Sequence, residues 1–270
     1  MSALRATMAC LWFATVSVAG PAAALHPDIQ QQAIELSQAA LGNRISDMAF
    51  VDSRGQSHRL SEFEGRPVAI SLVFTACVHA CSVTTRHIDR VAQIARAALG
   101  AESFTLLTIG FDTPVDTPEA LRAYANRHGI SDPNWHFLAS DDAEAMARLM
   151  EELGFVSVAS PRGFDHTVQL SLLDRDGILY RQVYGELFNT PLLVEPLKDL
   201  VLGRPASDDG LFTRVSNRVR LFCTVYDPKS GRYYFDYSLF AGMFIGVVFI
   251  GGVALWLLLE VRGARRRRTA

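Results

Sequence analysis

Two cysteines, Cys77 and Cys81, stand four residues apart in the segment FTACVHACS, directly after a run of apolar residues. They are two of only four cysteines in 270 residues, so their clustering is not a consequence of composition. Thiols at this spacing can form a disulfide, act as a redox couple or bind one metal ion between them. A helix that begins at the motif would favour the thiolate form.

A soft metal held by two thiolates leaves a coordination position that a histidine can fill. His79 lies between the cysteines, but at two residues from each it should point away from them on a helical turn. His166 opens the apolar stretch TVQLSLL, so we expect it to project from a loop at the end of a sheet. Two thiolates and one imidazole suit Cu(I) better than hard cations and also tolerate Cu(II), whereas zinc would want a fourth ligand. A lone histidine is more often structural, so the spacing alone leaves its role open.

The elements that would position these residues alternate along the chain. The run 67–74 is apolar throughout, which predicts a buried central strand, and 83–99 has apolar residues at helical spacing. The cysteines therefore fall between the carboxyl end of a strand and the amino end of a helix, where reactive groups gather in open α/β sheets.

The remaining elements predict the fold class. Further strands are expected at 49–51, 57–60, 104–109, 135–138, 167–173 and 178–184, and further helices at 29–41, 117–128, 140–153 and 192–202. This order predicts an α/β domain over 25–203, with a thioredoxin-like mixed sheet and flanking helices.

Both ends of the chain are expected to involve a membrane. Residues 1–24 combine Arg5, an apolar stretch and a small-x-small site, which indicates a cleaved export signal. Residues 239–259 carry no charge and are long enough, at about 1.5 Å per residue, to cross a hydrocarbon core of roughly 30 Å as one transmembrane helix. The basic tail 260–270 should stay cytoplasmic, which places the domain on the extracytoplasmic, periplasmic side. Residues 204–238 lack strong periodicity and are interpreted as a stalk.

The exported part of the chain is acidic. The formal charge is −2 for all 270 residues, and removing the tail (+4) and the signal (+1) leaves −7. This charge argues against a nucleic-acid partner. Outside the cytoplasm, neighbouring thiols oxidise unless a reductant or a metal holds them. With Cys10 in the signal, the mature chain keeps Cys77, Cys81 and Cys223, an odd number that a simple disulfide framework does not explain.

The joint pattern of cysteines and histidine resembles the Sco/SenC family of copper proteins over about residues 42–202. The segments that carry the resemblance are RISDMAFVDSRGQSHRLSEFEGRPVAISLVF, FTACVHAC and FDHTVQLSLLDRDG. The resemblance implies a thioredoxin-like domain, tethered to an energy-transducing membrane, that binds copper through Cys77, Cys81 and His166. It implies that Asp165 orients the imidazole. This chain departs from the family in lacking prolines beside the cysteines and in placing its span after the domain.

The resemblance also implies a function, a metallochaperone that assists assembly of the CuA centre of cytochrome c oxidase. The partners would be the copper-bearing subunit of that oxidase or another copper acceptor, together with a thiol reductant and the membrane. The alternative is a thiol-disulfide oxidoreductase that uses Cys77 and Cys81 as a redox pair without His166. A thiol peroxidase has less support, because Thr75 has no matching upstream proline. A purely structural disulfide is the remaining interpretation.

Overall fold

The computed structural model describes residues 27–77, 80–160, 163–202, 224–227, 232–235, 244–246 and 248–252. The chain enters through α1 (Pro27–Ala39), β1 (Ala49–Asp52), β2 (Ser57–Arg59) and the short 3-10 helix η1 (Leu60–Phe63). Alternating strands and helices follow: β3 (Val68–Val73), α2 (Ala80–Leu99), β4 (Thr105–Gly110), α3 (Pro118–His128), β5 (Trp135–Ala139) and α4 (Ala143–Glu152). The domain ends with β6 (Ser157–Ser160), β7 (Gly163–His166), β8 (Gln169–Leu173), β9 (Leu179–Tyr184) and α5 (Pro191–Leu202).

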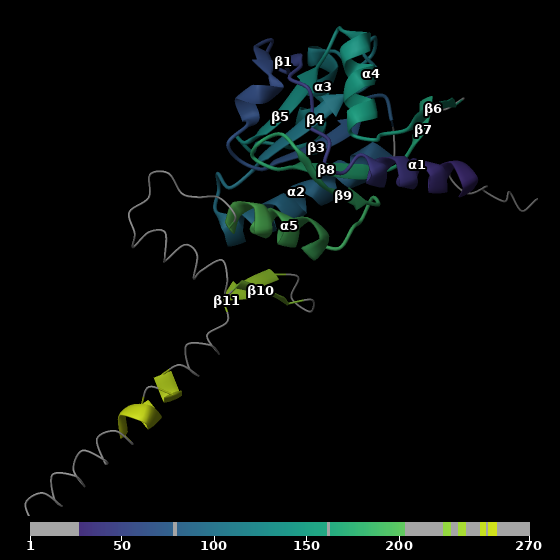
Figure 1. The fold of residues 1–270 in the computed structure, drawn as a ribbon. Coiled ribbons are helices and arrows are strands. Elements are labelled where there is room, and N and C mark those ends of the chain that lie inside the picture. The colour runs from purple at the N-terminus through teal and green to yellow at the C-terminus, as the bar shows by residue number, and fades with distance from the viewer. Residues whose placement is uncertain are drawn as a thin grey trace, which may run out of the picture.

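A seven-stranded mixed sheet forms the centre of the domain, in the order β2-β1-β5-β4-β3-β8-β9 (Figure 1). Strands β3, β4 and β5 are parallel, and β8 runs antiparallel to β3. Every residue of β3 and β4 is buried, as expected for parallel strands whose two faces are both covered by helices. The predicted mixed α/β thioredoxin-like fold with flanking helices is therefore confirmed.

Neighbouring residues of β3 enter two separate cores, because side chains alternate across a strand. Ala69 and Val73 pack with α2, α3 and α5, whereas Ile70 and Leu72 pack with α4 and η1 on the opposite face. Packing on both faces therefore fixes the end of β3, from which the next segment leaves the sheet. That segment is the cysteine motif.

The structure contains one hairpin in this domain that the sequence did not predict. Strands β6 and β7 pair only with each other, outside the main sheet, with Ser157 opposite His166. All four residues of β7 are half-buried, so the strand has no alternation of apolar and polar positions. The strand predicted to begin at Thr167 begins at Gln169.

The segment interpreted as a stalk also contains structure. Strands β10 (Thr224–Asp227) and β11 (Arg232–Phe235) form an antiparallel hairpin, and β11 contacts α2. Figure 1 shows this hairpin separate from the central sheet. Local periodicity did not predict it.

Most of the predicted membrane segments lie outside the described residues. The export signal 1–24 and the tail 260–270 are wholly outside them, and of the span 239–259 only 244–246 and 248–252 are described, both as helix. No helix among the described residues is long and apolar enough to cross a bilayer. The transmembrane helix stays a prediction.

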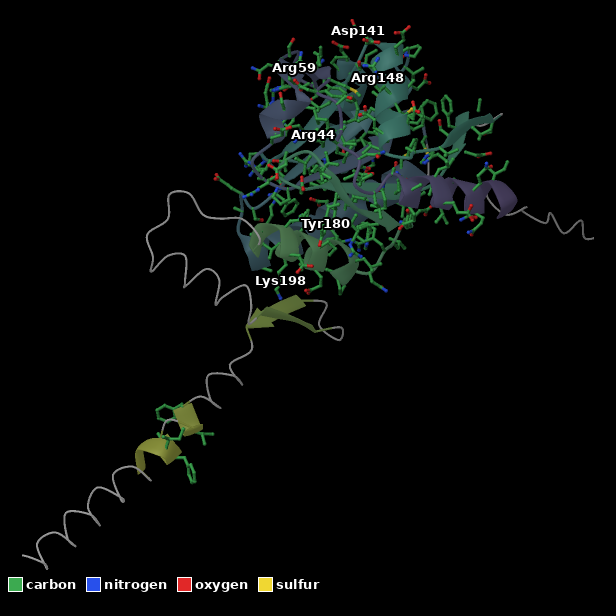
Figure 2. The ribbon with its side chains drawn as sticks, viewed as in Figure 1. Arg44, Arg59, Asp141, Arg148, Tyr180 and Lys198 are labelled. Atoms are coloured by element: carbon green, nitrogen blue, oxygen red, sulfur yellow. The ribbon has the colours of Figure 1, made fainter. Side chains whose placement is uncertain are left out.

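The described surface carries charges of both signs side by side (Figure 2). Arg59 donates to Asp47 at 2.7 Å, Arg44 lies 3.7 Å from Glu64, and Lys198 lies 3.8 Å from Glu195. The pairs of Arg59 with Asp47 and of Arg44 with Glu64 are exposed, and pairs of this kind contribute little to stability.

Candidate metal and redox site

The two cysteines follow the carboxyl end of β3. Cys81 is buried in the first turn of α2, and Cys77 is half-buried in the segment before that helix. Both are thiols, with no disulfide between them. A hydrogen bond with the Cys77 side chain, together with burial, raises the pKa of the Cys81 thiol. Cys81 therefore retains its proton more strongly than a free cysteine, and the more accessible Cys77 is placed to react first.

A buried carboxylate fixes the segment that leads to Cys77. Asp116 is fully buried and accepts hydrogen bonds from the Thr75 amide at 2.8 Å and the Thr75 hydroxyl at 2.6 Å. The Asp112 amide donates to the same carboxylate at 2.9 Å. Burial raises the pKa of Asp116 in spite of these three donors. Asp116 was not predicted as a site residue, although the motif FDTPVDTP directly after β4 places two acidic residues at the same sheet end.

His166 is the last residue of β7 and is half-buried. Its Nδ1 lies 3.1 Å from the carbonyl oxygen of Thr167, which can only accept, so Nδ1 carries the proton. The ring centroid lies 5.7 Å from that of Phe111 and 5.4 Å from that of Phe155. Nε2 is therefore the nitrogen that can accept a proton or bind a metal.

One cavity brings His166 and Cys81 together. It lies where the pairing of β3 with β8 ends, after Ser71 and Leu170. Its lining consists of Ser71, Leu72, Val73, Cys81, Thr84, His166, Val168 and Gln169. The sequence predicted that His166 would project from a loop at the end of the sheet; instead it ends β7, a strand outside the main sheet, and it lines a cavity together with Cys81.

The three predicted ligands do not form a closed metal site in this conformation. Cys77 interacts with Cys81, and Cys81 shares a cavity with His166. Yet no group of three His, Cys, Asp or Glu side chains in the described ranges could hold a metal ion. His79 lies outside those ranges, so its predicted orientation is untested.

Two buried polar atoms close to this cavity lack hydrogen-bond partners among the described residues. They are Gln169 Oε1 and Thr167 Oγ1. The other end of the Gln169 amide is held, because Nε2 donates to the Leu153 carbonyl at 3.3 Å. Gln169 was not predicted as a site residue, although a glutamine in the buried strand QLSLL could have identified it as a candidate.

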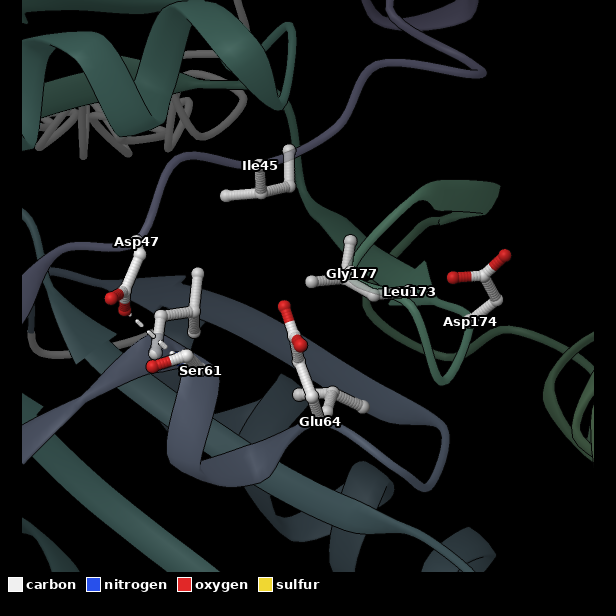
Figure 3. A pocket seen from close by; sticks show the side chains of 9 residues that line it. Ile45, Asp47, Ser61, Glu64, Leu173, Asp174 and Gly177 are labelled. Atoms are coloured by element: carbon white, nitrogen blue, oxygen red, sulfur yellow. Dashed lines mark hydrogen bonds between the residues drawn. The ribbon is translucent and has the colours of Figure 1, made fainter.

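A second cavity lies at the opposite end of the sheet, where β3 begins and β8 ends (Figure 3). It is lined by Ile45, Asp47, Leu60, Ser61, Glu64, Val68, Leu173, Asp174 and Gly177. Figure 3 shows Asp47 hydrogen-bonded to Ser61, a contact that lowers the pKa of Asp47 together with Arg59. This lining offers carboxylates but neither a thiol nor an imidazole, so it does not suit a soft metal.

The part of the chain that is similar to known proteins is the domain that contains the candidate site. The family model described as SCO1/SenC matches residues 38–201, more than half of the chain. A curated relative, the SCO1 protein homolog of Bacillus subtilis (strain 168), is 24% identical over 156 residues, which cover 56% of this chain and 78% of the relative.

Solved structures show the same fold. The structure of Bradyrhizobium japonicum ScoI with copper bound is similar with a TM-score of 0.50 and 21% identity, over 59% of this chain and 99% of that one. A structure of BsSco, described with a disulfide switch and as a member of the Sco family of cytochrome c oxidase assembly proteins, has a TM-score of 0.53 and 19% identity. That match covers 61% of this chain and 96% of BsSco.

Proposed function

Because this chain belongs to the SCO1/SenC family, we propose that it is a copper metallochaperone that assists assembly of the CuA centre of cytochrome c oxidase. Copper is its cargo, bound by Cys77, Cys81 and His166. The observation that carries this proposal is the cavity shared by Cys81 and His166, with Cys77 in contact with Cys81.

The donor set fits copper chemically. Two thiolates and an imidazole nitrogen are soft to intermediate ligands, which Cu(I) prefers and Cu(II) accepts. The hydrogen bond from His166 Nδ1 to the Thr167 carbonyl directs the free lone pair to Nε2. Copper binding must displace the Cys81 thiol proton, which the raised pKa of that thiol retains, so loading is coupled to proton release.

A second function, thiol-disulfide oxidoreductase, is favoured by one specific observation. The two sulfurs already interact, whereas the three ligands do not form a metal site in this conformation. In this role Cys77 would attack an acceptor disulfide and Cys81 would resolve the mixed disulfide, which returns two thiols to the acceptor and leaves a disulfide here. A thiol reductant would then regenerate the pair.

The proposed function also includes a membrane tether and a location of the domain. The cleaved signal 1–24, the transmembrane helix 239–259 and the basic tail 260–270 would hold the domain on the periplasmic side of the membrane, with the C-terminus in the cytoplasm. The acceptor would then be the copper-bearing subunit of the oxidase or another copper protein of the same membrane.

Copper binding by the reduced full-length protein tests the two functions against each other. We expect one Cu(I) per chain, with X-ray absorption showing about two sulfurs near roughly 2.3 Å, the usual metal-thiolate distance. His166→Ala should lose this copper, whereas His58→Ala, at a histidine paired with Glu62 instead, should keep it. A site with only nitrogen and oxygen ligands would exclude the chaperone function. Suppose that wild type reduces the disulfide of an acceptor without copper. If His166→Ala kept that activity in full, the protein would be better described as an oxidoreductase.

A further inference from the structure

A buried tyrosine connects α3 to the cysteine motif. Tyr124 has no exposed surface, and its hydroxyl donates to the main-chain carbonyl of Cys81 at 2.9 Å. The same hydroxyl lies 2.7 Å from Thr85 Oγ1. Because the tyrosine proton is used on Cys81, the Thr85 hydroxyl must be the donor in the second bond. The three residues thus form a continuous buried chain of hydrogen bonds.

The Cys81 carbonyl accepts a long-range side-chain hydrogen bond where a local one within α2 would be usual. Thr85 lies four residues after Cys81 on α2, where a threonine hydroxyl usually bonds back to the carbonyl one turn earlier. Here the phenol of Tyr124 stands between them, so the Cys81 carbonyl is held by a side chain from another helix.

Tyr124 is itself held in place. Its ring lies edge-on to His128 with centroids 4.5 Å apart and packs near Phe137 at 6.4 Å. It belongs to the same core as Cys81 and the buried face of α2. A side chain fixed on all sides can transmit its own position to the group it bonds.

We propose that Tyr124 is a positioning residue for the Cys77/Cys81 pair, fixing the first turn of α2 so that the Cys81 sulfur stays within reach of Cys77. The inference rests on the proposed function only in taking this pair as the reactive site. A disulfide needs the two Cβ atoms about 3.5–4.5 Å apart, and a shared metal needs both sulfurs within bonding distance of it, roughly 2.3 Å. Pre-organising the backbone of Cys81 favours both products over the separated thiols.

The thiol-disulfide equilibrium of copper-free, full-length protein with glutathione tests this role. The reaction converts the Cys77–Cys81 disulfide and two glutathione thiols into two protein thiols and one glutathione disulfide. Tyr124→Phe removes only the hydroxyl, and we expect it to destabilise the protein disulfide about three- to tenfold, tenfold being about 30 mV for this two-electron couple. Cu(I) affinity, measured by competition with a chelator, should fall by a similar factor.

A matched variant separates positioning from general stability. Tyr184 also has a bonded hydroxyl, which donates to Ser37 Oγ at 2.9 Å, between β9 and α1 and outside the cysteine motif. Tyr184→Phe and Tyr124→Phe should both lower the unfolding temperature, but Tyr184→Phe should leave the glutathione equilibrium unchanged. Thr85→Val keeps the bond between Tyr124 and Cys81 and should give a smaller shift of the same sign.

Failure of the positioning role and failure of the proposed chaperone function would give different results. If wild type bound no copper while Tyr124→Phe shifted the disulfide equilibrium, the chaperone would be excluded and the positioning role supported. An unchanged equilibrium in Tyr124→Phe, or an equal shift in Tyr184→Phe, would overturn the inference. Should Tyr124→Phe fail to fold, Thr85→Val decides, and an equilibrium identical to wild type there counts against the role.

Discussion

The ring of Phe74 packs directly on the backbone of Gly163, so that a Cβ built on Gly163 would stand 2.6 Å from Cε1 of the ring. Phe74 is the first residue of the segment FTACVHACS, and Gly163 begins β7, the strand that ends at His166. The neighbouring Phe164 meets the same ring edge-on, with centroids 5.3 Å apart. This contact therefore joins the two segments that supply the proposed ligands.

Gly163→Ala should separate those segments. Gly163 has a φ of +115°, which side chains rarely adopt, and its Cβ would displace the Phe74 ring. We expect the free energy of unfolding to fall by about 1–3 kcal/mol, together with weaker Cu(I) binding. Gly55→Ala is the matched control, because Gly55 has a φ of +84° but open space around its Cβ position. Equal effects of the two variants in chemical denaturation and Cu(I) titration would show that backbone strain alone is responsible.

Asp116 should make the protein's stability depend on pH. Burial raises its pKa above the ordinary value of 3.8, so the folded state prefers the neutral carboxyl. Its stabilising contribution is therefore fully present below about pH 4 and is lost as the pH rises through the folded-state pKa. We expect the free energy of unfolding of wild type, relative to Asp116→Asn, to decline over that interval. Denaturation curves from pH 4 to 8 measure it, and a difference that grew with pH would contradict the assignment.

The sequence predicted the position of the cysteines well because local signals determine it. The continuous apolar run that forms β3 and the helical spacing of apolar residues in α2 can both be recognised in short stretches of sequence. Together they place Cys77 and Cys81 at the sheet end. Short stretches of sequence cannot show which residues that lie far apart along the chain come into contact. Asp116 lies 41 residues from Thr75, and Tyr124 lies 43 residues from Cys81. Only the sheet order brings these pairs together.

His166 shows the same limit at one residue. Its place near the cysteine end followed from the apolar strand after it, but its own strand, β7, was not predicted, since every position there is half-buried. The hydrogen bond that fixes its tautomer goes to the next residue, Thr167, and depends on the turn between β7 and β8. Periodicity carries no information about such a turn.

The two buried glutamines of the β8–β9 hairpin should respond differently to the same substitution. Both donate to the Leu153 carbonyl, Gln182 at 2.8 Å and Gln169 at 3.3 Å. Gln182 Oε1 also accepts from the Ser171 hydroxyl at 2.7 Å, whereas Gln169 Oε1 has no partner among the described residues. Gln182→Leu leaves a buried hydroxyl without its acceptor and should cost about 1–3 kcal/mol, whereas Gln169→Leu should lie within about 0.5 kcal/mol of wild type.

Urea denaturation of the two glutamine variants measures the difference. A larger loss in Gln169→Leu than in Gln182→Leu would mean that Gln169 Oε1 has a bound water or ligand in solution. Such a partner would lie beside the cavity that Cys81 and His166 share. Copper titration of Gln169→Leu would then show whether that partner takes part in binding.

Cys223 is the one cysteine of the predicted mature chain outside the proposed site. It lies outside the described residues, directly before β10, in the segment expected to approach the membrane. In the predicted stalk this thiol would be accessible to a neighbouring membrane protein, but the proposed ligand set is complete without it. We therefore expect Cys223→Ser to keep one copper per chain and an unchanged Cys77/Cys81 redox equilibrium, whereas Cys81→Ser should lose both. Copper stoichiometry of the purified full-length protein decides the matter, since a fall to half or less in Cys223→Ser would make this cysteine a ligand.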